Sequence, residues 1–388
     1  MKIGLNGQVI QDENPAGPEL YTINLFKALA KIDNENEYTV YLSKEPTQDL
    51  IKKISGENKN FKFKFIDHKR MWTQKGLARE LLENHVDVFF TAIHTIPFRR
   101  NPKTKYVVMI HGLEQKYTKG YKNILKRLFI ERPIKYAIKK SDRIIVPSNA
   151  TRDEIIKRNW GVGREKIDVV YEGVSKDFYP REEEEILEIR EKYELGKDPY
   201  IFFVSTIQPR KNIPNLVRAF SQFIYENQDM KNLKLVIAGK NGWDYEESLA
   251  APQKFGVQEN VKFIGRVPSE DLPALFSGSK GYVNVSFEEG FGLPLLESMA
   301  CGTPSVVSNI PAHREVGDYL PFYANPHNIE NIKDGIHKLA YSEYNKQELL
   351  NRANLFSWEN TARETLEILK TTTFKGNKSN HEHYQELR

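Results

Sequence analysis

The sequence has a single cysteine, Cys301, among its 388 residues. One thiol excludes an internal disulfide, and this composition is typical of proteins from a reducing compartment. Cys301 follows an apolar helical stretch. We therefore expect it to be packed in the core instead of taking part in chemistry.

Long apolar runs are also missing. No segment reaches the roughly 20 apolar residues that a membrane span needs. The apolar part of the opening MKIGLNG is too short for a signal peptide and is typical of a first β-strand. We therefore expect a protein of the cytoplasm.

Several catalytic motifs are absent as well. No Asp-x-Asp pair follows a predicted strand, where it could hold a divalent cation against a diphosphate. There is no cysteine-based zinc site, no Gly-x-Ser-x-Gly elbow and no Walker loop. The sequence therefore predicts neither a metal site nor a bound cofactor.

The charge that is present is unevenly distributed. Residues 1–173 contain 32 Lys and Arg against 21 Asp and Glu, a balance of +11, whereas the remainder has 25 against 31, or −6. The basic excess is sharpest at residues 97–140, which hold 13 basic and two acidic residues. The first half of the chain should therefore attract an anionic surface.

Hydrophobic patterning indicates an α/β protein with two domains. Apolar strands alternate with helical stretches through both halves, and the chain is long for a single core. The predicted strands cover residues 2–6, 37–43, 61–66, 86–91, 105–110, 143–146 and 167–170, then 200–204, 233–238, 261–264, 281–285 and 305–307. The predicted helices cover residues 20–31, 77–84, 123–140 with an interruption at Pro133, 215–227, 328–341 and 344–355, and residues 148–151 form a helix start. We expect two doubly wound Rossmann-like domains facing each other across a cleft, because strand ends of parallel sheets form ligand sites.

The expected domain limits follow from this pattern. Residues 1–173 form the first domain, the acidic segment 174–198 connects the domains, and residues 199–360 form the second domain. A last helix covers about residues 361–373. The polar tail, residues 374–388, has no periodicity and should be disordered.

The stretch NVSFEEGFGLPLLESMACGT, residues 284–303, combines a strand end, a glycine loop and a helix predicted to begin at Pro294. Gly290 and Gly292 let a ligand approach the backbone, and the free N–H groups of the helix start favour an anion. Glu289 and Glu297 flank this cradle and could accept hydroxyl groups. A nucleotide sugar, which carries phosphate and hydroxyls, would suit it. The alternative is the ordinary joint of any α/β domain.

Two other predicted strand ends carry candidate site residues. Arg210 and Lys211, in PRKN, could neutralise a diphosphate and stabilise it as a leaving group, although an exposed charged loop is an equal alternative. His111 could hydrogen-bond a substrate hydroxyl near the reacting centre, or it could merely cap backbone groups. His94 occupies a similar position, and we expect it to be structural.

These motifs together resemble those of the retaining GT-B glycosyltransferases of family four, also called group 1. Glu289 and Glu297 match the family's Glu-x7-Glu motif, and PRKN matches its Arg-Lys phosphate loop. VYEGV at residues 170–174 is similar to a strand-to-linker signature that usually has Asn in place of Glu172. Residues 16–29 resemble the family's glycine loop and first helix, with a single Gly17 in place of a double glycine. FSWENTA, residues 356–362, resembles the segment from which the last helix returns to the first domain.

The resemblance implies roles for individual residues. Glu289 would hold hydroxyls of the donor sugar, and Glu297 would bind the ribose. Arg210 and Lys211 would stabilise the departing diphosphate, and His111 would face the donor sugar. Backbone groups would complete the donor site, namely those of Gly17, Gly265, Arg266, Val267, Gly290, Phe291, Gly292 and Leu293. The family's front-side mechanism retains configuration and needs no protein nucleophile.

The predicted function is therefore the metal-independent transfer of a hexosyl unit from a nucleoside diphosphate sugar to a saccharide or lipid-linked acceptor in surface polysaccharide or glycolipid synthesis. PRKN is similar to mannosyltransferase members, which favours GDP-mannose over UDP-sugars as the donor. The basic segment 97–140 interleaves apolar with cationic residues, so it could dock on anionic lipid at the inner membrane face. The alternative is a solvated basic surface over a buried helix.

Two other classes of function stay open. One is a nucleotide-sugar epimerase or a phosphorylase on a similar fold, against which the PRKN loop, the acid spacing and the lack of a pyridoxal-phosphate lysine motif speak. The other is a non-catalytic protein that binds anions or nucleic acid. No helix-turn-helix or aromatic single-strand motif supports nucleic acid as a partner.

Overall fold

The computed structural model describes residues 1–12, 15, 17–113 and 124–373, with the side chains of residues 124–129 outside that description. The polar tail, for which we predicted disorder, lies outside the described residues. No helix within the described part of the chain is long and apolar enough to cross a membrane.

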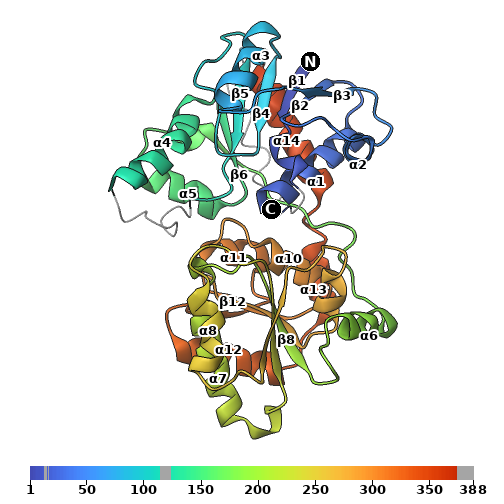
Figure 1. The fold of residues 1–388 in the computed structure, drawn as a ribbon, viewed down its shortest axis with the longest axis vertical. Helices are drawn as coiled ribbons and strands as arrows, with labels where there is room; N and C mark the ends of the chain where they lie inside the picture. Colours follow the sequence, from blue (N-terminus) through green and yellow to red (C-terminus); the bar gives the residue numbers. More distant parts are fainter. Residues whose placement is uncertain (13–14, 16, 114–123, 374–388) are drawn as a thin grey trace.

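Two parallel sheets organise the molecule, one above the other in Figure 1. The first has the order β3-β2-β1-β4-β5-β6-β7. Its strands are β1 (Lys2–Asn6), β2 (Glu37–Leu42), β3 (Phe61–Phe65), β4 (Val88–Thr91), β5 (Lys105–Met109), β6 (Arg143–Val146) and β7 (Ile167–Val169). Every pair is parallel, as the near-continuous apolar runs require when both faces of a sheet are covered.

The second sheet has the order β10-β9-β8-β11-β12-β13 and is also parallel throughout. Its strands are β8 (Tyr200–Val204), β9 (Lys234–Ala238), β10 (Val261–Gly265), β11 (Gly281–Asn284), β12 (Ser305–Ser308) and β13 (Phe322–Ala324). The order reverses between β1 and β4 in the first sheet and between β8 and β11 in the second. Such reversals open a crevice at the carboxyl ends of the strands, where ligands bind.

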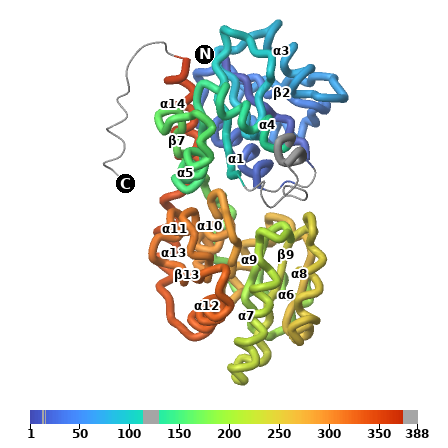
Figure 2. Tube along the Cα trace, turned by 90° about the vertical axis from the view of Figure 1, so that its left-hand side faces the viewer, coloured from blue at the N-terminus to red at the C-terminus, as the bar shows by residue number. Residues whose placement is uncertain are grey.

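Helices cover both faces of each sheet, as the two views show (Figures 1 and 2). On the first sheet they are α1 (Gly17–Ile32), α2 (Gln48–Ser55), α3 (Ala78–Glu83), α4 (Ile124–Lys140) and α5 (Asn149–Lys157). The helices that come after β7 in the chain are α6 (Glu183–Lys192), α7 (Ile213–Glu226), α8 (Glu246–Lys254), α9 (Leu272–Ser277), α10 (Leu293–Ala300), α11 (Pro311–Gly317), α12 (Ile329–Tyr341), α13 (Lys346–Ala353) and α14 (Trp358–Thr373). Of these, α14 packs on the first domain. The doubly wound α/β architecture expected from the sequence is confirmed.

Alternate residues of each strand enter separate cores. In β5, Val107 and Met109 pack with α1 and α14, whereas Tyr106 and Val108 face the opposite core. This is the two-residue period of a strand that is buried on both faces.

The chain crosses between the domains twice, and the two crossings lie side by side. The backbone N–H of Val174 donates to the carbonyl of Phe356 at 3.2 Å. A β-carbon on Gly173 would lie 2.1 Å from the nitrogen of Trp358, so only glycine allows this approach. After the second crossing, α14 packs against α1 of the first domain, red beside blue in Figure 1.

Some local expectations were wrong. We expected the helix at residues 123–140 to be interrupted at Pro133, but α4 runs through this proline without a break. The helices α2, α8, α9 and α11 and the strand β13 were not predicted. They are short or weakly periodic, and their packing against the sheets stabilises them.

Candidate functional site

The loop after β8 carries two cations at the point where the strand order of the second sheet reverses. Pro209–Lys211 forms a single 3-10 turn that ends at Asn212, a residue with a left-handed backbone. The side-chain amide of Asn212 donates to the carbonyl of Val285 at 2.9 Å and to that of Pro326 at 2.8 Å. These bonds fix the PRKN loop against the end of β11, so Arg210 and Lys211 point toward the loop that follows β11.

Glu289 lies between those cations. Its carboxylate accepts from Lys211 Nζ at 2.6 Å and from Arg210 Nη1 at 2.8 Å, and all three side chains are about nine-tenths buried. Burial alone would raise the pKa of Glu289, but Arg210 and Lys211 outweigh it and hold the pKa well below its usual range. The cluster is therefore fully ionised and carries a net charge of about +1, which suits an anionic ligand.

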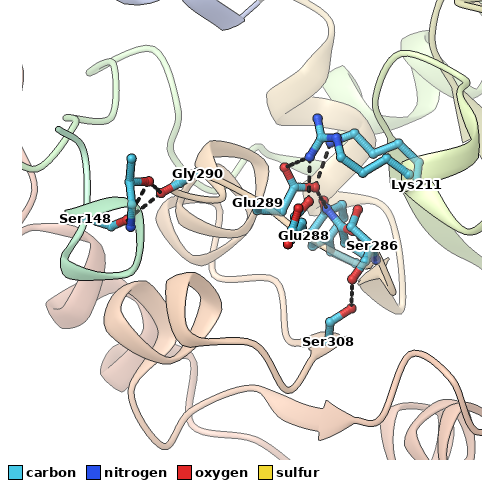
Figure 3. Close-up of polar contacts among 11 residues, drawn as sticks. Ser148, Lys211, Ser286, Glu288, Glu289, Gly290 and Ser308 are labelled. Atoms are coloured by element: carbon cyan, nitrogen blue, oxygen red, sulfur yellow. Dashed lines mark hydrogen bonds and ion pairs between the residues drawn. The ribbon is translucent and has the colours of Figure 1, made fainter. Parts of the chain in front are cut away.

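A buried polar network supports this cluster from below (Figure 3). Asn284 accepts from the backbone N–H of Ser286 at 3.0 Å and places its amide 3.5 Å from Glu289 Oε1. Ser308 donates from β12 to the carbonyl of Ser286. These small polar residues hold the strand ends together. In the sequence these three polar residues stand at or just after the ends of apolar strands, but nothing there indicates that they bind one another.

The loop from Gly290 to Gly292 leads into the N-terminus of α10. Gly292 has a φ of +103°, a conformation that glycine adopts without strain. Phe291 is buried against Tyr171 and Phe356, and Leu293 begins the helix. This is the predicted glycine loop and helix start, one residue shifted because Leu293 and not Pro294 is the first helical residue.

Gly290 brings this loop into direct contact with the first domain. A β-carbon on Gly290 would lie 1.9 Å from the carbonyl oxygen of His111, which follows β5. Only glycine permits that approach. His111 and the Glu289–Gly292 loop, which were proposed separately from the sequence, therefore lie on either side of one interdomain contact.

Residues at the start of α5 hydrogen-bond to the same loop. Ser148 Oγ donates to the carbonyl of Gly290 at 2.6 Å, and Thr151 Oγ1 donates to it at 3.1 Å (Figure 3). Glu315 of α11 accepts from the backbone N–H groups of Asn149 at 2.8 Å and Ala150 at 2.7 Å. The sequence marked this segment as a helix start, but it gave no sign that the cap would bind the other domain.

Glu297 lies farther along α10 in a different setting. Burial, and secondarily the negative charge of Glu172, raise the pKa of Glu297 to about 8. The carboxyl is therefore largely neutral at pH 7 in the absence of a ligand. A neutral carboxyl can donate as well as accept a hydrogen bond.

Buried His313, on α11, was missed in the sequence. Its Nδ1 lies 3.1 Å from the carbonyl of Ser308, and a β-carbon on Gly292 would lie 2.9 Å from its Cδ2. Burial lowers the pKa of His313 to about 4. A neutral imidazole therefore packs directly under the glycine loop, and it is one reason why residue 292 must be small.

The remaining predicted site residues lie apart from this cluster. Gly265 ends β10, two strands from β8, with a φ of +71°, and its carbonyl accepts from Gly239 N at 2.7 Å. Arg266 is exposed and Val267 is half-buried just beyond it. Gly17 begins α1 and is exposed. Residues 13, 14 and 16 of the early loop lie outside the described residues.

Two further points concern groups outside the cluster. Cys301 is buried, as expected, and burial raises the pKa of its thiol. In the described part of the chain, no group of three or more His, Cys, Asp or Glu side chains is placed to hold a metal ion.

Known proteins share both the sequence pattern and the fold. Residues 15–178 match the family described as Glycosyltransferase Family 4, and residues 185–355 match Glycosyl transferases group 1. O-antigen chain mannosyltransferase B of Escherichia coli is 31% identical over 62% of this chain and 64% of its own length. O-antigen chain mannosyltransferase RfbU of Salmonella typhimurium is 28% identical over 63% and 65%. The chain thus matches less than two thirds of the length of these relatives.

Solved structures extend the likeness of fold to nearly the whole chain. Sucrose-phosphate synthase from Thermosynechococcus elongatus superposes with a TM-score of 0.74 at 18% identity, covering 95% of this chain and 98% of that one. Anabaena HepE, in complex with UDP-glucose, gives 0.72 at 16% identity, covering 96% and 100%. The two family matches follow one another along the chain and span both sheets. The chain therefore belongs to the group 1, family 4 glycosyltransferases and has the GT-B fold.

Proposed function

We propose that this protein is a retaining hexosyltransferase that moves a mannosyl unit from GDP-mannose to a saccharide or lipid-linked acceptor. The observation that carries this proposal is the buried cluster of Arg210, Lys211 and Glu289 beside the N-terminus of α10. It offers two cations and the positive end of the α10 dipole to a diphosphate, and a carboxylate to sugar hydroxyls. Mannosyltransferases among the relatives support the choice of sugar.

The cluster suggests how binding and departure of the diphosphate are linked to the sugar. Without a donor, Glu289 binds both Arg210 and Lys211 and offsets one of their two positive charges. A bound diphosphate takes over these cations and frees the carboxylate to accept from sugar hydroxyls. Glu297 accepts from the ribose, and backbone groups of Gly17, Gly265, Arg266 and Val267 complete the nucleotide site.

In the transfer step, the bond between the sugar's anomeric carbon and the diphosphate oxygen breaks. The acceptor oxygen forms its bond on the same face, and its proton passes to the leaving diphosphate. Arg210, Lys211 and the α10 N-terminus stabilise the negative charge that develops on that group. These protein charges neutralise the diphosphate in place of a metal ion.

Thermal-shift measurements with GDP, UDP and ADP test the nucleotide. A nucleotide present at a hundred times its dissociation constant stabilises the fold by about 2.7 kcal/mol. We expect GDP to give the largest shift and Lys211→Ala to reduce it, whereas Lys231→Ala, which removes an exposed lysine of the same domain, should leave it unchanged. A shift with UDP alone would replace the donor by a UDP-sugar. No shift with any nucleotide would contradict the proposal.

Transfer itself is tested with GDP-mannose and extracted lipid-linked saccharides. We expect wild-type protein to release GDP in step with mannosylated product, and Glu289→Ala to abolish the reaction. Release of GDP from the variant at the wild-type rate would contradict the assigned role of Glu289.

We also propose that the basic surface of the first domain docks on anionic lipid at the inner membrane face. Within the described side chains of segment 97–140, an exposed set supports this, comprising Phe98, Arg99, Lys103, Arg132, Lys135, Lys139 and Lys140. The apolar residues 124, 125, 128 and 129, on which the sequence argument also relied, lie outside the described side chains. Each cation near an anionic surface contributes about 1 kcal/mol.

Liposome sedimentation at low salt tests this docking. Wild-type protein should bind vesicles that contain anionic lipid and not neutral vesicles, and Arg99→Glu with Lys103→Glu should weaken binding. The matched control, Lys197→Glu in the connection together with Lys231→Glu in the second domain, should bind as wild type does. Equal binding to neutral vesicles, or no binding at all, would rule out electrostatic docking.

A further inference from the structure

Glu172 is a buried carboxylate that the transfer mechanism above does not use. It stands just after β7, where the chain leaves the first sheet, and is 8% exposed. Its Oε1 lies 3.5 Å from Nδ1 of His111. In the sequence this position stood out because the resembling signature usually has an amide there. A buried carboxylate needs a compensating partner, and the ring of His111 is the partner at hand.

The hydrogen bonds of His111 decide where its protons are. Nε2 lies 3.0 Å from the carbonyl of Ala92, which can only accept, so Nε2 must carry a hydrogen. In a neutral imidazole, Nδ1 would then turn a lone pair toward the carboxylate of Glu172. That arrangement is repulsive unless one more proton lies between the two groups.

We propose that Glu172 holds His111 as an imidazolium, with Nε2–H bound to the carbonyl of Ala92 and Nδ1–H facing the carboxylate of Glu172. Glu172 is then a positioning residue for His111. Because neither ring nitrogen is free, the ring does not carry protons to or from the substrate. The ring supplies a fixed positive charge, and His111 contacts Gly290 through its backbone carbonyl.

Two other side chains that contact His111 in the described part of the chain, those of His94 and Tyr21, are neutral. His94, which follows β4, accepts the backbone N–H of His111 through Nε2 at 3.0 Å. Burial, and secondarily His111, lower the pKa of His94 to about 3. Tyr21 of α1 meets the ring edge-on at 4.7 Å, and burial raises the pKa of its phenol. Among these neighbours, Glu172 therefore supplies the negative charge.

The pair has a direct connection to the proposed reaction, and this part of the inference rests on the proposed function. The carbonyl of His111 abuts Gly290, and the following residues up to Leu293 form the proposed diphosphate site. A fixed cation behind that contact favours the state in which negative charge moves onto the leaving diphosphate. Its loss should lower the rate of transfer more than the affinity for the donor.

The test compares Glu172→Gln with wild type by two readouts. With 15N-histidine labelling and His111→Gln to assign the signals, wild-type protein at neutral pH should show two protonated ring nitrogens at His111. In Glu172→Gln one of them should become unprotonated, because the amide donates where the carboxylate accepted. The kcat for transfer should fall about tenfold, with KM for the donor within about twofold. Glu172→Asp should recover part of both, and Glu184→Gln, an exposed acid on α6, should change neither.

Two results would overturn the inference. One is a His111 spectrum that is the same in Glu172→Gln and wild type, whatever the activity, because the residue would then act only through packing. The other is an altered spectrum with an unchanged kcat. Failure of the proposed function has a different signature: wild-type protein would neither bind nucleotides nor transfer sugar, while the His111 signals would still respond to Glu172→Gln.

Discussion

Glu289 and Glu297 are two carboxyls on one loop–helix segment whose pKa values move in opposite directions. Glu289 is ionised because Arg210 and Lys211 bind it directly. The pKa of Glu297 rises to about 8 because it is buried near the negative Glu172. The Glu-x7-Glu motif therefore gives no sign of this difference, because the surroundings of a carboxyl and not its residue type set its pKa.

The pKa of Glu297 makes nucleotide binding depend on pH. A ribose diol donates best to an ionised carboxylate, which the free protein acquires only as the pH rises through about 8. We expect GDP affinity to increase between pH 6.5 and 8.5, by up to about tenfold per unit below 8, with proton release in calorimetry. Glu297→Gln should remove this dependence. In the free protein the same group favours folding below its unfolded pKa, and that contribution is lost as the pH rises toward 8.

Removing the charge of Glu289 leaves two buried cations without their shared partner. We expect Glu289→Gln to lower the free energy of unfolding by about 3–5 kcal/mol, as found when one member of a buried ion pair is deleted. Denaturant titration measures this loss, and GDP should restore much of it because the diphosphate replaces the carboxylate. Glu226→Gln, at a carboxylate that is 51% exposed and pairs with Lys333, should cost under about 1 kcal/mol. Equal losses at the two sites would contradict the buried cluster.

At the scale of elements, the start of α5 links the Glu289–Gly292 loop to the first domain. Glu315 completes the helix start by accepting from Asn149 and Ala150, while Ser148 and Thr151 bind the Gly290 carbonyl. A carboxylate at a helix N-terminus is stabilised by the helix dipole and by free N–H groups. The contact therefore sets how the two strand edges face each other.

Glu315→Ala should loosen this arrangement without unfolding either domain. We expect a cost of about 1–2 kcal/mol and a larger radius of gyration by small-angle scattering. Transfer should slow because His111 no longer meets Gly290, while GDP binding by the second domain persists. Glu188→Ala, an exposed acid on α6, should have the wild-type radius. An unchanged radius together with normal transfer would show that the α5 contact does not hold the domains.

At the scale of the whole molecule, the end of the chain stabilises its beginning. Trp358 of α14 packs edge-on against Tyr21 of α1 at 5.5 Å and belongs to the core of the first domain. The second domain thus lies between the two crossings as one continuous segment, whereas the first domain is completed by α14 from the end of the chain.

Calorimetry should therefore separate the two domains. Trp358→Ala removes a large buried side chain and should destabilise the first domain by about 3–5 kcal/mol, which lowers one thermal transition. GDP should raise the other transition, because its proposed contacts are mainly with the second domain. Tyr225→Ala, at an 83% exposed side chain, is the matched control and should shift neither. If Trp358→Ala lowered only the transition that GDP raises, α14 would belong to the second domain.

Most strands were predictable because their signal is local. Residues 2–6, 143–146 and 200–204 form strands at the predicted bounds, since an apolar run between turn residues has few other solutions. The short helices α8, α9 and α11 were not predictable, because packing against the sheet, and not their own periodicity, stabilises them. The interruption predicted at Pro133 was wrong for a related reason: the surroundings of α4 outweigh the local preference of proline.

The candidate site shows the same division. The sequence by itself determined which residues end strands, where glycine must bend the chain and which loops carry charge, because neighbouring residues settle these features. Only the tertiary structure decided the pairings: Glu289 with Lys211, 78 residues away, Ala150 with Glu315, 165 residues away, and His111 with Glu172. Those contacts depend on strand order and on how the two sheets face each other, and no local pattern contains that information.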